Sequence, residues 1–413
     1  MIKTSHHWCD PLELASSLQQ NEANFVFLYS SLKTSYSGNK SWIGLDVEEI
    51  CQDIDKLDII DQQKWFGYFA YELDNLFDQT ELWKSQPSWI NIPPVCWMKF
   101  RRVLCFDHEN QTITEFHREK NKLDLTNLKK FTPTPVASIK NINCTFPKNE
   151  YLQVAEKTIA AIHAGDFYQA NITRKYYGEF SQKPDDFSIF LRLCAASPAP
   201  YSAFMRINNT SIISSSPELF LKIKENGEIN TRPIKGTKSL NSSSNELQNS
   251  SKDRAENLMI VDLMRNDLSK ICKIGSVKIG GLYEVDDFST LRHLSSDING
   301  RLKENISPVN AALHCLPPGS MTGAPKKRAI EWCATYEKMR RGIYSGCLGW
   351  LSEKEAELSV VIRTIILQDK SFEFQVGGGI VADSSSESEW EETLTKASGV
   401  ARALGITVED LMR

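Results

Sequence analysis

Hydrophobic and polar positions alternate with a period of two along several segments, which predicts strands. In residues 371–382 (SFEFQVGGGIVA), apolar and polar residues alternate before three successive glycines. Residues 167–180 predict another strand, and residues 211–237 predict two strands joined by an Asn-Gly turn. Nearer the start, residues 65–73 form an aromatic run suited to a strand, and residues 96–116 predict a hairpin. Many hairpins with helices between them favour an α+β fold over a doubly wound parallel sheet.

Three segments instead repeat apolar positions at the spacing of amphipathic helices. The first is expected to begin with Asn149 as its cap and to end at Gly165. The second covers residues 252–267, where apolar residues on two sides, Leu258 among them, predict a largely buried helix. The third covers residues 386–404 and carries a single apolar stripe.

Two of these helices carry an acidic pair at i, i+3 spacing. The pairs are Asp253 with Glu256, and Glu389 with Glu392. Two such pairs facing one cleft would repel each other strongly unless a cation lay between them. A hard divalent ion that takes oxygen ligands, most simply Mg²⁺, would satisfy both pairs. The alternatives are ion pairs with arginines on the same helix, and a solvated acidic helix face.

Other residues indicate a place for an anion. The three glycines at 377–379 offer backbone N–H groups without side chains over them, although a bulge at a strand end is the alternative. Arg363 is a single cation inside the apolar run 360–367, which predicts a buried guanidinium that needs a planar anion. His293, taken alone, is typical of a core histidine.

Composition narrows the class of protein. The 413 residues are 41% hydrophobic, which is enough for a large core, and the net charge of −4 without a basic run argues against nucleic acid as a partner. We expect a cytoplasmic protein, because no signal peptide or long apolar run is evident and the ten cysteines are scattered. The sequence contains no glycine-rich nucleotide motif.

Lys235 stands in the segment TRPIKGTKSL, between Ile234 and Gly236. Taken alone, it is most simply a surface lysine in a turn. A site with anion holders, a metal ion, one lysine and no nucleotide motif would instead suit a small molecule with several carboxylates.

Several segments together resemble the chorismate-utilising enzymes, and within them the aminodeoxychorismate synthase branch. They are SSSPELFL, RPIKGT, DRAENLMIVDLMRNDL, RHLSSDI, PPGSMTGAPKKRAIE, GCLGWLS, VVIRT, GGGIVADS and EWEETLTKA, in family order. The N-terminal third resembles the family more loosely. With a Pro- and Thr-rich connection at 130–141, we expect an N-terminal region at 1–140 and a chorismate-binding catalytic domain at 145–413. The resemblance implies a four-layer α/β/β/α core with two orthogonally packed antiparallel sheets and peripheral helices.

The resemblance also implies roles for individual residues. Mg²⁺ would be bound by Glu256 and Glu392, with Asp253 and Glu389 behind them through water. Chorismate would be held by Gly236, Thr237, Thr322, Tyr344, Arg363, Gly377, Gly378 and Gly379. The catalytic candidates are Lys235, Glu218 and His293. A possible tryptophan pocket would be walled by Ser31, Pro200, Tyr201 and Ser202.

Lys235 separates two members of the family, because anthranilate synthases usually carry alanine at this position. In the aminodeoxychorismate branch, the lysine attacks chorismate at C2 as the C4 hydroxyl leaves with a proton from Glu218. Ammonia then adds at C4 and expels the lysine. Water-using relatives have a lysine base where Gln169 stands, which argues against water as the nucleophile. The alternative activity is anthranilate formation, by amination at C2 and loss of pyruvate.

The implied product is 4-amino-4-deoxychorismate, on the route to para-aminobenzoate and folate. Its ammonia is expected from a separate glutamine amidotransferase subunit, because the sequence shows no glutaminase cysteine motif. A catalytically silent binding subunit is disfavoured, since every reactive position holds a suitable residue. Two departures from the family are a serine-rich insertion, predicted to be a mobile surface loop over 239–253, and Trp350 in place of a frequent tyrosine.

Overall fold

The computed structural model describes residues 1–34, 36–73, 83, 85–118, 122–125, 128–239, 243–287 and 291–412. Within these ranges every pairing between named strands is antiparallel, and the strands form one hydrogen-bonded network. The long strands β3 (Lys40–Cys51) and β5 (Val95–Asp107) pair with each other and join two sheets. The predicted antiparallel α+β character is therefore confirmed.

The first sheet extends from β3 through strands that come from distant parts of the chain. In order they are β2 (Asn24–Tyr29), β9 (Tyr201–Ile207), β10 (Thr210–Ser216), β19 (Thr364–Gln368), β20 (Ser371–Ile380) and β8 (Gln169–Phe180). Strand β8 also pairs with β7 (Ile139–Cys144) and the short β16 (Gly323–Ala324). On the other side, β5 pairs with β6 (Thr112–His117), which pairs with β1 (Ile2–His6).

The second sheet starts from the first half of β5. In order its strands are β4 (Trp65–Phe69), β17 (Cys347–Leu351), β18 (Ala356–Val360), β11 (Leu219–Ile223), β12 (Glu228–Arg232) and β15 (Leu291–Arg301). Strands β13 (Ile234–Ser239) and β14 (Lys278–Asp287) pair with β15. Strands from the N-terminal region thus pair with strands from the C-terminal region, and the expected boundary near residue 140 stays a prediction.

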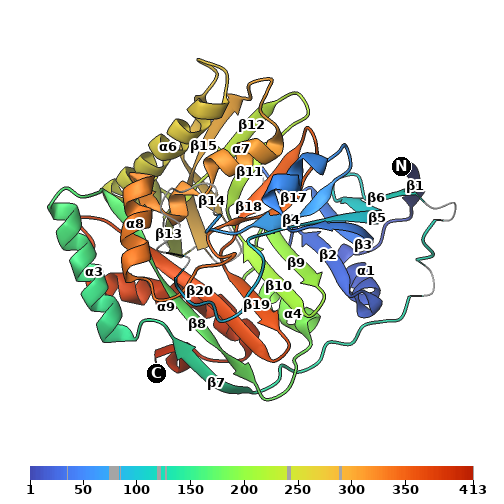
Figure 1. Ribbon diagram of the computed structural model, residues 1–413, viewed down its shortest axis with the longest axis horizontal. Coiled ribbons are helices and arrows are strands. Elements are labelled where there is room, and N and C mark those ends of the chain that lie inside the picture. The colour runs from blue at the N-terminus through green and yellow to red at the C-terminus, as the bar shows by residue number, and fades with distance from the viewer. Residues whose placement is uncertain are drawn as a thin grey trace.

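Helices cover both sheets (Figure 1). Helices α3 (Lys148–His163), α4 (Asp186–Ala196), α8 (Lys326–Tyr336) and α9 (Ser386–Leu404) pack on strands of the first sheet, and α6 (Ser251–Ile271) packs on β13 and β15 of the second. Helix α7 (Pro308–Cys315) packs on α6, while α1 (Pro11–Leu18) and α5 (Ser244–Gln248) are short. Figure 1 shows α6 above the centre of the view and α3 and α9 below it.

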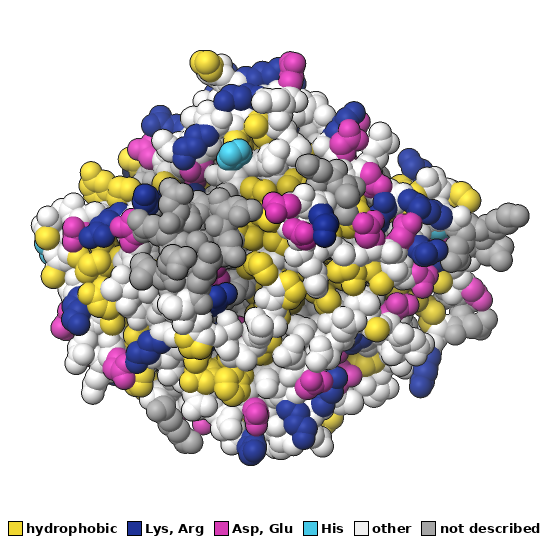
Figure 2. All heavy atoms as spheres, viewed as in Figure 1, with side chains coloured by type: hydrophobic (Ala, Val, Ile, Leu, Met, Phe, Trp, Pro, Cys, Tyr) yellow, Lys and Arg dark blue, Asp and Glu magenta, His cyan; other side chains and the backbone are white. Residues whose placement is uncertain are grey.

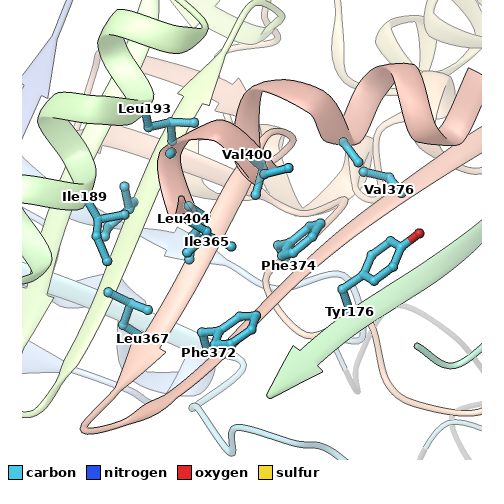
Figure 3. Packing of buried hydrophobic residues seen from close by; sticks show 14 of the residues in the cluster. Tyr176, Ile189, Leu193, Ile365, Leu367, Phe372, Phe374, Val376, Val400 and Leu404 are labelled. Atoms are coloured by element: carbon cyan, nitrogen blue, oxygen red, sulfur yellow. The ribbon is translucent and has the colours of Figure 1, made fainter. Parts of the chain in front are cut away.

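The apolar stripe predicted for residues 386–404 is buried as expected. Figure 3 shows Val400 and Leu404 of α9 close to side chains of α4, β19 and β20, including Leu193 and Phe374. Each such side chain stabilises the fold by about 1.5–3 kcal/mol when it is fully buried. This packing fixes α9, and therefore its acidic first turns, against the end of β20.

Two local helix predictions are wrong. Helix α3 starts directly after Pro147, so Asn149 lies inside its first turn instead of capping it. Pro147 has an extended backbone (φ −56°, ψ 161°) and takes the place before the helix. Leu258 is 43% exposed, because α6 rests on one sheet face and its opposite side meets solvent. The predicted end of α3 is confirmed, since Gly165 has a φ of 87° just beyond it.

The predicted loop over 239–253 is also wrong in part. Helix α5 occupies 244–248, and α6 begins at Ser251. The Ser250 hydroxyl accepts the backbone N–H of Asp253 at 3.3 Å and caps α6, which is a common use of serine. A serine-rich stretch can therefore start helices as well as form loops. Residues 240–242 lie outside the described residues.

Two findings bear on partners. On the face shown in Figure 2, basic and acidic side chains are interspersed, so that face has no broad basic area for a phosphate backbone. Among the described residues, none of the helices combines the length and apolar character that crossing a membrane requires.

Candidate active site

Two short crossings between the two sheets lie at the candidate site. One crossing joins β10 to β11 through Pro217 and Glu218, and the other joins β18 to β19 through residues 361–363. The Val360 N–H donates to the Glu218 carbonyl at 3.0 Å, and the Ser215 N–H donates to the Arg363 carbonyl at 3.2 Å. The two crossings are thus tied to each other through the backbone.

Arg363 was expected inside an apolar strand, and this expectation is wrong. It lies between β18 and β19 with a φ of 51°, a left-handed conformation that interrupts the strand and redirects its side chain. Its Nη1 donates to the Ser197 hydroxyl at 3.3 Å, and burial lowers its pKa to about 10. Among the described residues no carboxylate lies within 4 Å of this guanidinium. It remains charged at neutral pH and can receive an anion.

Glu218 follows the first crossing and is 5% exposed. Burial raises its pKa to about 7, although a hydrogen bond with Ser320 and the charges of Lys235 and Lys396 act in the opposite direction. A carboxyl group with this pKa holds a proton for part of the time at neutral pH and can release it. This is the property that a general acid needs.

Lys235 lies in strand β13 and is half-buried. Its Nζ is 3.2 Å from the point that a Cβ on Gly379 would occupy, and the Gln169 Nε2 is 2.6 Å from the same point. Gln169 is fully buried, and neither atom of its amide has a hydrogen-bond partner within the described ranges. The fold therefore brings an amine and an unsatisfied amide together at the glycine end of β20.

Glycines also allow carboxylates to approach the strand ends. A Cβ on Gly378 would meet the Glu389 Oε2 at 2.6 Å, and a Cβ on Gly236 would meet the Asp253 Cγ at 3.0 Å. Gly236 has a φ of 78°, which most other residues would adopt only with strain. Both glycines are thus required by the close approach of the acidic helices.

The four predicted metal ligands come from α6 and α9. Glu389 is buried and accepts the Ser384 hydroxyl at 2.6 Å, whereas Glu392 is exposed and pairs with Lys396 at 2.6 Å. Glu256 is half-buried on α6. In the part of the chain that the structure describes, no three His, Cys, Asp or Glu side chains form a cluster that could hold a metal. The carboxylate oxygens over glycine cradles nevertheless fit a hard ion such as Mg²⁺.

The arginines that could have neutralised the α6 pair have other contacts. Arg265 pairs with Asp262 at 3.0 Å, and Arg254 lies 4.5 Å from the centre of the Tyr283 ring.

Three other predicted substrate and catalytic residues, His293, Tyr344 and Thr322, are buried. The pKa of His293 is lowered to about 3, mainly by burial and also by the charge of Arg363. Its imidazole is therefore neutral at pH 7. Burial raises the pKa of Tyr344 far above neutrality, which leaves its phenol protonated. The Thr322 hydroxyl is buried and donates to the Pro318 carbonyl at 2.9 Å. Thr237 pairs with His293 through the backbone, and its side chain lies outside the described part of the structure.

The residues of the possible tryptophan pocket lie together. The Ser31 and Ser202 hydroxyls are 2.8 Å apart. Pro200, Tyr201 and Ser202 line a cavity of about 1310 Å³. Its lining also includes Trp350, whose ring lies 3.2 Å from the Lys64 ammonium. Trp350 therefore has a definite role as the aromatic partner of a cation in this cavity.

Sequence reasoning missed two residues near the glycine strand end. The Lys396 Nζ donates to the Gly377 carbonyl at 3.0 Å, and its spacing four residues after Glu392 could have revealed their ion pair. The Tyr151 hydroxyl is buried, has no hydrogen-bond partner among the described residues, and lies 3.5 Å from the Cβ position of Gly378. No sequence signal separates this tyrosine from an ordinary core residue.

Comparisons with known proteins show the family to which the chain belongs. A family model for chorismate binding enzymes matches residues 14–402. "Aminodeoxychorismate synthase component 1" of Salmonella typhimurium is 36% identical over 349 residues, covering 82% of this chain and 76% of the relative. "Anthranilate synthase component 1" of Aquifex aeolicus is 31% identical over 372 residues, covering 83% of this chain and 74% of the relative.

A solved structure supports the fold as well. Anthranilate synthase component I from Streptococcus pneumoniae aligns with a TM-score of 0.77 at 23% identity, over 90% of this chain and 94% of that chain. With a family match across most of its length and relatives above 30% identity, the chain belongs to the family of chorismate binding enzymes.

Proposed function

We propose that this protein converts chorismate and ammonia into 4-amino-4-deoxychorismate, on the route to para-aminobenzoate and folate. The similarity to aminodeoxychorismate synthase component 1 over 82% of the chain supports this activity. The observation that carries the proposal is the half-buried Lys235 amine at the glycine end of β20, with its charge acting on the buried Glu218.

In the proposed reaction, the amine of Lys235 attacks C2 of chorismate. The two conjugated double bonds of the ring shift, and the C4 hydroxyl leaves as water with a proton from Glu218. Ammonia then attacks C4, both double bonds shift back, and the bond between C2 and the lysine nitrogen breaks. Glu218 regains a proton from the added nitrogen. Lys235 is released, and the net change replaces the C4 hydroxyl with an amino group.

Binding would depend on groups that hold the two chorismate carboxylates. Arg363 and the backbone N–H groups of residues 377–379 are suited to this task. Bound Mg²⁺, held by Glu256 and Glu392 with Asp253 and Glu389 behind them through water, would add positive charge beside a carboxylate. Lys396 now pairs with Glu392, so that pair would have to open.

Gln169 and the relatives' names bear on the source of nitrogen. A neutral amide beside Lys235, in place of a base, favours ammonia over water as the second nucleophile. The relatives are named component 1, which supports a second component. We propose that this partner is a glutamine amidotransferase that supplies ammonia.

We also propose the finer arrangement of the fold, a four-layer core with two orthogonally packed sheets.

The test is to incubate the purified protein with chorismate, Mg²⁺ and an ammonium salt and to identify the products by chromatography and mass spectrometry. We expect 4-amino-4-deoxychorismate without release of pyruvate. Anthranilate together with pyruvate would instead establish the alternative activity, which the 31% identical relative represents. A folded protein that forms neither product would contradict both.

A further inference from the structure

The Tyr151 hydroxyl lies at the glycine end of β20, 3.5 Å from the position that a Cβ on Gly378 would occupy. The Tyr151 side chain is 0% exposed, and its hydroxyl has no hydrogen-bond partner among the described residues. A buried hydroxyl without a partner costs a fold about 1–3 kcal/mol, and native proteins rarely contain one. This hydroxyl is therefore suited to a partner that arrives with a ligand.

The ring of Tyr151 is held by its neighbours, so the hydroxyl cannot move to another partner. Its centre lies 5.9 Å from that of the Trp390 ring on α9. The Arg174 guanidinium lies 5.7 Å from the centre of the Tyr151 ring and 3.6 Å from that of Trp390. Arg174 is fixed in turn, because it donates to the Phe146 carbonyl at 3.2 Å and to the Thr393 hydroxyl at 3.0 Å. Packing alone thus sets the place of the hydroxyl.

A carboxylate shares the space beside Gly378. The Glu389 Oε2 lies 2.6 Å from the same Cβ position, and Glu389 is 4% exposed. A Cβ on the next residue, Gly379, would instead meet Gln169 and Lys235, because successive residues of a strand face opposite sides. Tyr151 and Glu389 therefore lie together on the side of β20 that α9 covers.

The carboxylate decides which ligand fits the hydroxyl. A carboxylate of chorismate would be repelled by Glu389. A water molecule bound to Mg²⁺ fits, because its oxygen faces the metal and both of its hydrogens can be donated. Glu389 can accept one hydrogen and the Tyr151 oxygen the other. Burial raises the pKa of Tyr151 well above its usual value, so the phenol also keeps a hydrogen of its own to donate at neutral pH.

We propose that Tyr151 is a positioning residue for the metal, and that its hydroxyl and Glu389 together hold a water of Mg²⁺. The inference rests on the proposed function, which includes this ion. Outer hydrogen-bond partners orient the ligands of a metal, and losing one lowers metal affinity about 10–100-fold. Because Tyr151 belongs to α3, the proposal adds a third helix to the metal site of α6 and α9.

The experiment compares Tyr151→Phe with Tyr176→Phe, since each removes one buried hydroxyl and keeps the ring. Tyr176 of β8 is 1% exposed and donates to the Leu411 carbonyl at 3.2 Å, and Figure 3 shows it beside Phe374. In EDTA we expect Tyr151→Phe to unfold at no lower temperature than the parent, because the lost hydroxyl had no partner. Tyr176→Phe should unfold about 1–2 °C lower.

Calorimetric titration with MgCl₂ then measures the affinity for the metal. We expect the Kd for Mg²⁺ to rise about tenfold in Tyr151→Phe and to stay within about twofold of the parent in Tyr176→Phe. Raising the MgCl₂ concentration should bring the rate of chorismate amination by Tyr151→Phe back to within about twofold of the parent rate.

Two results would overturn the proposal. One is an unchanged Kd for Mg²⁺ in Tyr151→Phe. The other is a lower unfolding temperature of Tyr151→Phe in EDTA, because the hydroxyl would then have a partner without the metal. If the parent itself did not bind Mg²⁺, the premise and the proposal would both be wrong. Formation of 4-amino-4-deoxychorismate by the parent tests the proposed function separately, so the two failures are distinguishable.

Discussion

The candidate site has two walls that differ in burial and in chemistry. The wall on the first sheet consists of the glycine end of β20 with Gln169 and Glu389, both buried. The wall on the second sheet carries Lys235 and Asp253, which are half-buried. In the proposed reaction, the glycine amides of the first wall hold an anion, and Lys235 of the second wall is the nucleophile. This difference suggests that substitutions on the first wall raise KM, whereas substitutions on the second lower kcat.

The largest effect is expected on the second wall, for Lys235→Ala. Removing the nucleophile should lower the rate of 4-amino-4-deoxychorismate formation about a hundredfold or more, with little change in chorismate affinity. Residual turnover should shift toward the 2-amino isomer, because ammonia could attack C2 directly. Rapid quenching without ammonia should trap an adduct on the peptide that contains Lys235. A wild-type rate in Lys235→Ala and no adduct in the parent would exclude this role.

Glu218→Gln should lower the rate of 4-amino-4-deoxychorismate formation nearly as much as Lys235→Ala does. The amide cannot donate the proton that the leaving hydroxyl needs. In the parent, the rate should fall as pH rises through about 7, where Glu218 loses its proton. Burial makes the folded protein hold this proton more tightly than the unfolded chain, so Glu218 destabilises the fold as pH rises from 4.5 toward 7 and above. Glu218→Gln should therefore be no less stable than the parent at pH 8. A flat pH profile would contradict the assignment.

In the proposed site both walls supply metal ligands, so Glu256→Gln and Glu392→Gln should behave alike. Losing a charged ligand should cost about 2–4 kcal/mol of transition-state stabilisation, or roughly a hundredfold in rate. Glu391→Gln, an exposed position on the same helix as Glu392, is the matched control. Calorimetric titration with Mg²⁺ should show weaker binding only in the first two variants. Unchanged activity of the parent in EDTA would refute the metal assignment.

Arg363 lies at the junction of the two walls, and Arg363→Lys should weaken the binding of chorismate moderately. The charge remains but the planar fork that matches a carboxylate is lost, so the KM for chorismate should rise about tenfold. Steady-state kinetics at saturating ammonium would measure this change. Equal KM values for the parent, Arg363→Lys and Arg363→Ala would make the arginine structural.

The smallest effect is expected outside both walls, for Gly165→Ala. This glycine has a φ of 87° with open space around its α-carbon, so only backbone strain opposes the substitution. The free energy of unfolding should fall by about 1 kcal/mol, while kcat and KM stay unchanged. Denaturant unfolding measures the loss. A change in either kinetic constant would show that the C-terminal end of α3 contributes to the site, and the division into two walls would need revision.

The sequence predicted elements best where one periodic signal extended over many residues. Helix α9 spans the expected 386–404, because its apolar stripe and its packing against β20 agree. Arg363 was misplaced because the run 360–367 is apolar on both sides of Arg363 and Thr364, and nothing in that pattern marks a turn between two sheets. Leu258 was misjudged because periodicity shows which residues share a face, and not which faces a neighbour covers.

The candidate site was predicted more completely in its residues than in its contacts. The glycines at 377–379 and Lys235 stood out in the sequence itself, whereas Glu218 and the role of Lys235 came from the resemblance. The structure brings Lys235 and Gly379 together. The hydrogen bond from Lys396 to the Gly377 carbonyl depends on side-chain geometry across elements. Periodicity along the chain contains no information about contacts of this kind.

The two crossings between the sheets also restrict how chain length can vary in this protein. Only two residues separate β10 from β11, and three separate β18 from β19. Because side chains alternate between faces, inserting one residue at either crossing would turn the following strand's inward side chains outward. Insertions and deletions should therefore accumulate at hairpins away from these points. The serine-rich segment between β13 and α6 is such a place, where added length leaves the register of both sheets unchanged.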